Sequence, residues 1–452
     1  MNRDRYVDLL RVVSLGVVIV GHWLMAVVAV GDDGAVRATN ALALLPSLQP
    51  LTWLLQVMPV FFLVGGFSHA TALASVARRG GGYADFVRSR AGRLLRPTAV
   101  FIAVWLALAL AFELTGHDRG LLRLATRTVA QPLWFVGVYL GVVALAPAML
   151  RLHRRLGAAA WAAPAALGGC AAAVDVLRFG YGVPMVGYLN VAFVWLAVHQ
   201  LGYLYADGRL GRRTGFALTG GGLAATVALT AFGPYPVSMV GMPGDRVSNM
   251  SPPTLALLAH AAWLTGLVLL LRGPVSRWLD RPRVWRGGGT EQSGPRSSAG
   301  RPGPLANSLA MTAFLWHLTA LFVATAGTVA LRLAQPAVGS TGWWLLRPAW
   351  IAVLAMFTAA LVLAFRRADR PRPARVPGSA AVRSHRTAAA ATGMALCTVG
   401  ILGFSAVGFG GLLAGRTATL VVLPVTPLLS AGVLAAGSVL LRVTRPRESL
   451  SL

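Results

Sequence analysis

The hydrophobic residues of this chain come in blocks of about twenty, and Arg, Gly or Pro bounds each block. An α-helix needs about 20 apolar residues to cross the hydrocarbon core of a bilayer. We therefore expect an all-α fold, a polytopic helical bundle integral to the membrane, without a soluble catalytic domain of ordinary size. The pattern predicts twelve spans, over residues 9–31, 52–77, 97–115, 129–150, 158–177, 187–206, 214–232, 253–272, 306–331, 343–366, 387–412 and 417–441.

The basic residues are distributed unevenly between the two sides of this expected bundle. All 41 of them are Arg. With the N-terminus in the cytoplasm, the inner segments hold 32 Arg and the outer segments hold nine. The positive-inside rule expects this asymmetry, so we predict a multi-pass protein of the cell membrane with cytoplasmic N- and C-termini. Arg119, Arg123 and Arg127, which share one outer segment, are the exception.

Composition excludes several other classes of protein. Only 12% of the residues are charged, whereas a soluble globular chain has about 25%. The net charge of +27 lies between apolar blocks, so it indicates membrane topology and no nucleic-acid partner. Cys170 and Cys397 each lie inside an apolar block, which predicts neither a disulfide framework nor a metal site.

Two inner segments are rich in Gly, Pro, Ser and Arg, and they have too few apolar residues to bury a core. These are residues 281–304 and 366–386. We expect both to be disordered.

Polar residues in the first expected span form a single stripe. His22 follows Arg11 by eleven residues, which is three helical turns plus about 20°. Asp8 lies on the same side, and His22 would lie near mid-membrane. Because a polar group in lipid is costly, such groups usually face a cavity or a partner. The stripe indicates either a functional path from the inner surface or, equally well, interfacial anchors with a His that packs against a neighbouring helix.

His317 is the second histidine of interest, about eleven residues into the ninth expected span. The first and ninth spans both run outward, so we expect His22 and His317 to reach similar depths, where they could meet. Packing between helices remains an equal alternative. His69, His199 and His260 show no comparable alignment, and we expect them to serve packing only.

A basic ridge precedes the third expected span. Arg90, Arg93 and Arg96 repeat every three residues, and Pro97 follows. Guanidinium groups bind phosphate in a bidentate manner, so the ridge could hold a phosphorylated ligand. Attraction to anionic lipid at the inner surface explains the ridge equally well.

Five motifs in this order resemble those of the acyltransferase-3 family. The family opens with Arg, ten residues and then His, and has four further motifs. The matching residues here are Arg11 and His22 with Asp8 before them, PVFFLVGGF from Pro59 to Phe67, Arg93 and Arg96 before Pro97, Leu133-Trp134-Phe135, and Leu315-Trp316-His317. The chain departs from the family at Gly65, where many members have Ser, and at the residues that replace Ser-Tyr…Tyr, namely Ala310, Met311 and Phe314.

The resemblance implies a ten-span acyltransferase domain over residues 1–366. A basic inner linker over 367–386 would follow, and then two additional spans with a short cytoplasmic tail over 387–452. The activity implied is transfer of an acyl group from cytoplasmic acyl-CoA to a hydroxyl, as in O-acetylation of the cell envelope. The acceptor would be an envelope carbohydrate, a lipid or a secondary metabolite, and no metal is expected.

The resemblance also suggests roles for the residues singled out above. His22 would be the general base, since an imidazole is suited to take up a hydroxyl proton. Arg11 and Asp8 would position His22 or the thioester. Arg90, Arg93 and Arg96 would hold the phosphates of acyl-CoA, and His317 would orient the acceptor or stabilise charge.

Two other functions compete with this one. Twelve spans with both ends inside also suit a secondary transporter. Against a transporter, the two halves of the chain show no matching pattern, and the intramembrane acids that proton-coupled transporters usually need are scarce. A non-catalytic envelope protein is favoured only if His22 is dispensable.

Overall fold

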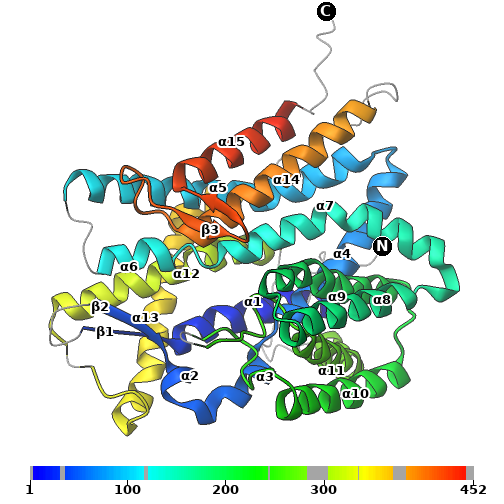
Figure 1. Ribbon diagram of the computed structural model, residues 1–452, viewed down its shortest axis with the longest axis horizontal. Coiled ribbons are helices and arrows are strands. Elements are labelled where there is room, and N and C mark those ends of the chain that lie inside the picture. Colours follow the sequence, from blue (N-terminus) through cyan, green and yellow to red (C-terminus); the bar gives the residue numbers. More distant parts are fainter. Residues whose placement is uncertain are drawn as a thin grey trace, which may run out of the picture.

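The computed structural model of the chain describes residues 4–30, 36–116, 121–242, 245–281, 304–333, 335–369 and 383–443. Most of the long helices lie side by side and run in roughly the same direction, with α13 steeply inclined to them, and together they form one bundle (Figure 1). The sequence-based expectation of disorder over 281–304 and 366–386 falls mainly on residues outside the described ranges.

The helices account for most of the described chain. The α-helices are α1 (Arg5–Met25), α2 (Ala41–Leu44), α3 (Thr52–Leu55), α4 (Met58–Arg78), α5 (Tyr83–Leu114), α6 (Leu121–Thr128), α7 (Leu133–Leu156), α8 (Ala162–Asp175), α9 (Asn190–Ala206), α10 (Arg212–Phe232), α11 (Leu255–Asp280), α12 (Pro304–Ala330), α13 (Thr341–Phe365), α14 (Arg383–Val407) and α15 (Pro427–Val443). Short 3-10 or π turns extend or join them, at η1 (Pro46–Leu51), η2 (Gly157–Ala159), η3 (Val176–Gly180), η4 (Pro184–Leu189) and η5 (Arg366–Asp369). Antiparallel pairs are formed by β1 (Ala26–Val30) with β2 (Val36–Asn40) and by β3 (Ala418–Leu420) with β4 (Leu423–Val425).

The polytopic helical fold expected from the sequence is confirmed. Within the described ranges, eleven helices are long and apolar enough to cross a membrane, and they coincide with the first eleven predicted spans. The last helix, α15, is apolar but has 17 residues. The span predicted from residue 417 begins later, because the β3–β4 hairpin occupies the residues before Pro427.

Two boundaries near the candidate site also differ from the prediction. Helix α1 ends at Met25 instead of residue 31, because Ala26–Val30 pairs with Val36–Asn40 as a hairpin. The Val-rich sequence of Ala26–Val30 favours extended backbone. Helix α5 begins at Tyr83 and includes Pro97, where the span was predicted to start. The basic ridge therefore lies on the same continuous helix as the third span.

The crossing of α4 and α9 brings two backbones into contact. A Cβ atom on Gly66 would lie 2.1 Å from the carbonyl oxygen of His199, and a Cβ atom on Gly202 would lie 2.7 Å from the Cα atom of Gly66. Such approaches are too short for real Cβ atoms, so only glycine fits at either position. The contact fixes the part of α4 that carries Ser68 and His69.

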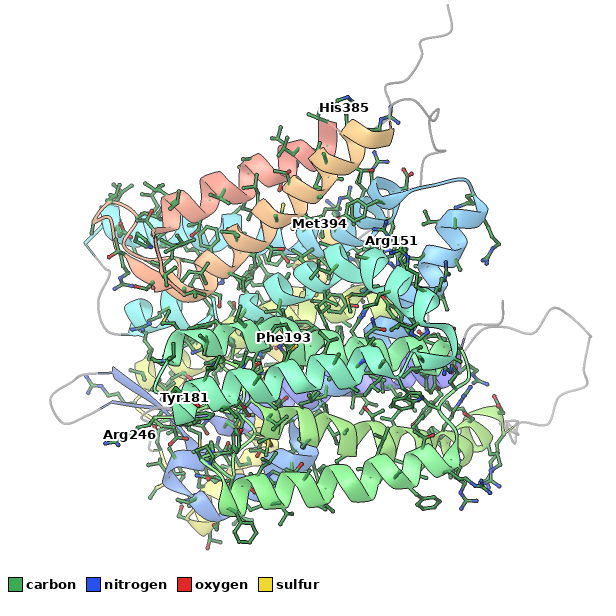
Figure 2. The ribbon with its side chains drawn as sticks, turned by 45° about the vertical axis from the view of Figure 1, so that its right-hand side comes forward. Arg151, Tyr181, Phe193, Arg246, His385 and Met394 are labelled. Carbon is green, nitrogen blue, oxygen red and sulfur yellow. The ribbon has the colours of Figure 1, made fainter. Side chains whose placement is uncertain are left out.

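The last two helices, α14 and α15, pack against each other and lie over α5 and α7 (Figure 1). Glu113 in the last turn of α5 accepts backbone N–H bonds from Gly411 at 2.5 Å, Leu412 at 2.9 Å and Leu413 at 2.8 Å. Hydrogen bonds to a charged acceptor are stronger than neutral ones. Side chains fill the space between these helices and the rest of the bundle (Figure 2), so the pair is integrated with the remaining helices.

Candidate active site

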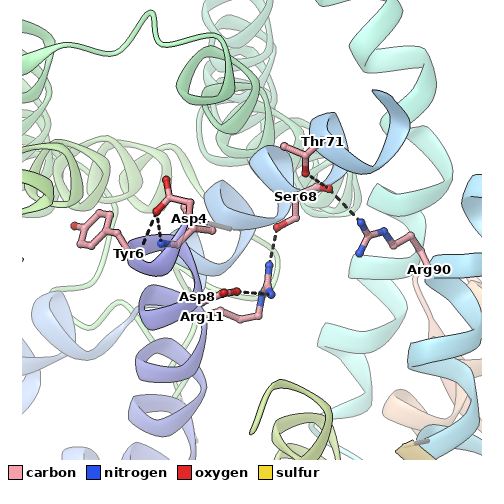
Figure 3. Close-up of polar contacts among 8 residues, drawn as sticks. Asp4, Tyr6, Asp8, Arg11, Ser68, Thr71 and Arg90 are labelled. Carbon is pink, nitrogen blue, oxygen red and sulfur yellow. Dashed lines mark hydrogen bonds and ion pairs between the residues drawn. The ribbon is translucent and has the colours of Figure 1, made fainter. Parts of the chain in front are cut away.

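Two arginines converge on Ser68 of α4 (Figure 3). Nη2 of Arg11 in α1 donates to Ser68 Oγ at 2.6 Å, and its Nη1 lies 3.5 Å from Oδ1 of Asp8. Nη2 of Arg90 in α5 donates to the carbonyl oxygen of Ser68 at 3.2 Å. Three helices thus meet at one residue. Among these three charged groups two are cationic and one is anionic, so the cluster can attract a negatively charged group.

His22 and His317 lie against each other, as the depth argument from the sequence predicted. The two atoms His317 Nε2 and His22 Nδ1 are 3.3 Å apart. Trp23 Nε1 donates to the carbonyl oxygen of His317 at 3.1 Å, which holds α1 against α12. His317 is fully buried and His22 is half-buried.

The hydrogen-bond partners assign the tautomer of each neutral ring. His22 Nδ1 lies 2.8 Å from the carbonyl oxygen of Val18, and His317 Nδ1 lies 2.6 Å from that of Phe314. A carbonyl oxygen only accepts, so both Nδ1 atoms carry the proton. His317 Nε2 is then a bare acceptor that shares the His22 Nδ1 proton with Val18. The free lone pair of His22 is on Nε2, the nitrogen that can take up a proton.

The site has two parts, separated along α1. Eleven residues of helix place His22 about 16 Å from Arg11. Because α1 ends at Met25, His22 lies in its last turn, and not at the centre of the helix as the predicted span 9–31 implied. One end of α1 therefore presents cationic groups, and the other presents an imidazole pair.

The structure separates the three arginines of the predicted ridge. The Arg90 side chain contacts Ser68, and it is close enough to the positive charges of Arg11 and Arg93 to be repelled by them. Arg93 is exposed and Arg96 is half-buried. The Arg90 side chain thus contacts Ser68, while the Arg93 side chain is open to solvent or lipid headgroups.

A second buried histidine pair was not predicted. His69 Nδ1 lies 2.9 Å from His199 Nε2, and Tyr139 Oη lies 3.4 Å from His69 Nε2. The sequence does contain a signal, because His69 is three residues from Gly66 and His199 is three residues from Gly202. Residues three apart share a helix face, so a His at this spacing lies beside the contact that the glycines allow.

A family model described as an acyltransferase domain matches residues 4–367 of the chain. The chain belongs to the acyltransferase-3 family. It is therefore an acyltransferase, as the five motifs suggested. The match includes the helices that carry Arg11, His22, Ser68, Arg90 and His317, whereas α14 and α15 lie outside it. No curated protein and no solved structure matches the chain.

Proposed function

We propose that this acyltransferase-3 protein moves an acyl group from cytoplasmic acyl-CoA to a hydroxyl group of an envelope carbohydrate, a lipid or a secondary metabolite. The observation that carries the proposal is the hydrogen-bonded pair of His22 and His317. This pair leaves a proton-accepting nitrogen on a helix whose other end carries a cationic cluster. General acid–base catalysis of acyl transfer needs such a positioned imidazole.

In the proposed reaction, His22 Nε2 takes up the proton of the acceptor's hydroxyl group while the oxygen of that hydroxyl group attacks the carbonyl carbon of the thioester. The C–S bond breaks, and the sulfur leaves as a thiolate that takes the proton back from His22 Nε2. The products are an ester and the free thiol of CoA. While the ring is protonated, His317 Nε2 stabilises it by accepting a hydrogen bond from the Nδ1–H group of His22.

The cationic end of α1 suits the negatively charged part of the donor. Arg11 and Arg90, fixed by Ser68, would hold a phosphate or a polarised carbonyl, with Asp8 orienting Arg11. Arg93 and Arg96 would add contacts to phosphate. The long pantetheine arm of acyl-CoA suits a separation of about 16 Å between the two ends of the site.

The test uses the full chain in lipid nanodiscs with radiolabelled acetyl-CoA and an extract of envelope glycans and small metabolites. We expect label that mild alkali releases, as it does from O-esters. His22→Ala should lower this transfer roughly 10²–10⁴-fold. His22→Gln should be nearly as inactive, because an amide keeps a hydrogen bond but is no base near neutral pH.

His260→Gln is the matched control, since His260 also lies in a membrane-spanning helix but bonds the carbonyl oxygen of Gln56. It should keep most of the activity. If His22→Gln transfers label at near the normal rate, His22 is not the base. A transporter would yield no labelled ester with any variant.

A further inference from the structure

We infer that Phe409, which follows α14 outside the family match, is a positioning residue that holds His317 in contact with His22. The inference rests on the function proposed above. Phe409 is fully buried, and its ring lies between the aromatic side chains of α5. From there, two chains of contacts lead to α12. One ends at Trp316, just before His317 in the sequence, and the other ends at Thr319, just after it.

The first chain of contacts passes through Phe101. The ring centroid of Phe101 lies 5.8 Å from that of Phe409 and 5.2 Å from that of Trp316, and both contacts are edge-to-face. Aromatic pairs in this geometry contribute about 0.5–1.5 kcal/mol beyond their buried area. Trp316 precedes His317 directly, so this contact limits the rotation of α12.

The second chain of contacts passes through Trp105. Its ring stacks on Phe409 with centroids 6.2 Å apart, and its Nε1 donates to Thr319 Oγ1 at 3.1 Å. Thr319 and Trp316 are three residues apart, so they lie on the same face of α12. The two α5 side chains therefore hold one face of α12, and His317 points from an adjacent face toward α1.

The segment that carries Phe409 is held in place by backbone contacts with α6 and by the Glu113 side chain of α5. Its backbone N–H donates to the carbonyl oxygen of Thr126 at 3.0 Å. Gly408 has φ +79° and lies against α6, where a Cβ atom would be 3.0 Å from the Thr126 carbonyl oxygen. Glu113 binds the backbone from Gly411 onward. The segment around Phe409 is therefore anchored to α5 and α6, and this fixes the place of the Phe409 ring against Phe101 and Trp105.

The bond between the two histidines is sensitive to such positioning. At 3.3 Å, His317 Nε2 is near the outer limit of a hydrogen bond to His22 Nδ1. A small rotation of α12 would break this bond and leave the Val18 carbonyl as the remaining partner of His22 Nδ1. The acyl-CoA end of the site would be unaffected, because Arg11 and Arg90 are held by α4 and not by α12.

The principal variant is Phe409→Leu, which removes the ring but stays apolar. We expect kcat to fall roughly ten- to hundredfold, as small misplacements of catalytic groups do, with the KM for acetyl-CoA unchanged. In a His317→Ala background, Phe409→Leu should cause no further loss, because the residue acts through His317. Losses that multiply in the double variant would overturn the inference.

Met394→Ala is the matched control. Met394 is also fully buried in the C-terminal helix pair, but it lies fifteen residues before Phe409, in α14 (Figure 2). It should lower thermal stability at least as much as Phe409→Leu while leaving kcat per folded protein within about twofold. Equal losses of kcat in the two variants would show a general packing role instead.

A second readout does not depend on activity. In protein labelled with ¹⁵N-histidine, the His22 and His317 signals, assigned with Gln variants, should report the shared Nδ1 proton in the wild type and in Met394→Ala. That signature should be lost in Phe409→Leu. If it persists there, Phe409 does not position the pair. If the wild type shows the signature but forms no ester, the proposed function fails while the positioning role stands.

Discussion

At the scale of single residues, the two histidines of the pair have unequal roles. Both Nδ1 atoms face backbone carbonyl oxygens, so each ring is held in one tautomer and one orientation. For His22 this leaves Nε2 free to take up a proton, and for His317 it leaves Nε2 to accept a hydrogen bond from His22 Nδ1. In the proposed reaction, His317 would therefore act through His22 and would not serve as a second base.

This inequality predicts different results from two substitutions at His317. His317→Gln can keep an acceptor oxygen near His22 Nδ1, whereas His317→Leu fills the space without one. Since a hydrogen bond to a charged group contributes about 1.5–3 kcal/mol, we expect His317→Leu to lower kcat roughly 10- to 150-fold and His317→Gln to lower it less. Steady-state kinetics of both purified variants measure this. Equal activity of the two would mean that His317 only fills space.

At the scale of helices, the sequence predicted those features that depend on local pattern. The blocks of apolar residues located the spans, and their direction predicted that His22 and His317 meet. The predicted end of α1 was wrong because Ala26–Val30 becomes a strand only through its pairing with β2. The predicted start of α5 was wrong because Pro97 is accommodated inside the helix. The His69–His199 contact depends on two helices distant in sequence, so the Gly-to-His spacing on each helix does not by itself show that the two helices cross.

Because α5 carries the whole basic ridge, its arginines can be tested within one helix. If Arg93 and Arg96 bind the phosphates of acyl-CoA, replacing both with Gln should raise the KM for acetyl-CoA by about tenfold or more, since each lost charged contact contributes about 1.5–3 kcal/mol. Arg88→Gln should do less, because Arg88 pairs with Asp85 in its own helix. Like behaviour of all three would identify the ridge as a lipid anchor.

At the scale of the whole molecule, the arrangement of helices bears on topology. Helix α1 begins and α15 ends toward the same end of the bundle (Figure 1). An even number of crossings would have this consequence, and the positive-inside rule predicts that the side with the excess of Arg is the cytoplasmic one. The donor and the cationic end of α1 would then be on the same side of the membrane.

A reporter fused after Leu452 tests this orientation. We expect green fluorescence from a C-terminal fluorescent protein and no activity from a C-terminal alkaline phosphatase, because the latter folds only outside the cytoplasm. The same reporters placed in the outer segment after α10 should give the opposite pattern. An active phosphatase at the C-terminus would contradict the twelve-crossing arrangement.

The crossing of α4 and α9 also sets how far this protein can vary by mutation. Every missense single-base change at a glycine codon adds at least a Cβ atom, and at Gly66 or Gly202 that atom meets backbone that cannot move aside. Gly16 and Gly21 have nothing within 4 Å of such an atom, and they line an apolar groove of about 360 Å³ on α1. Alanine there would even favour the helix by about 1 kcal/mol. In a population of random variants, two glycines would thus be invariant and two freely replaced, although all four lie in apolar helices.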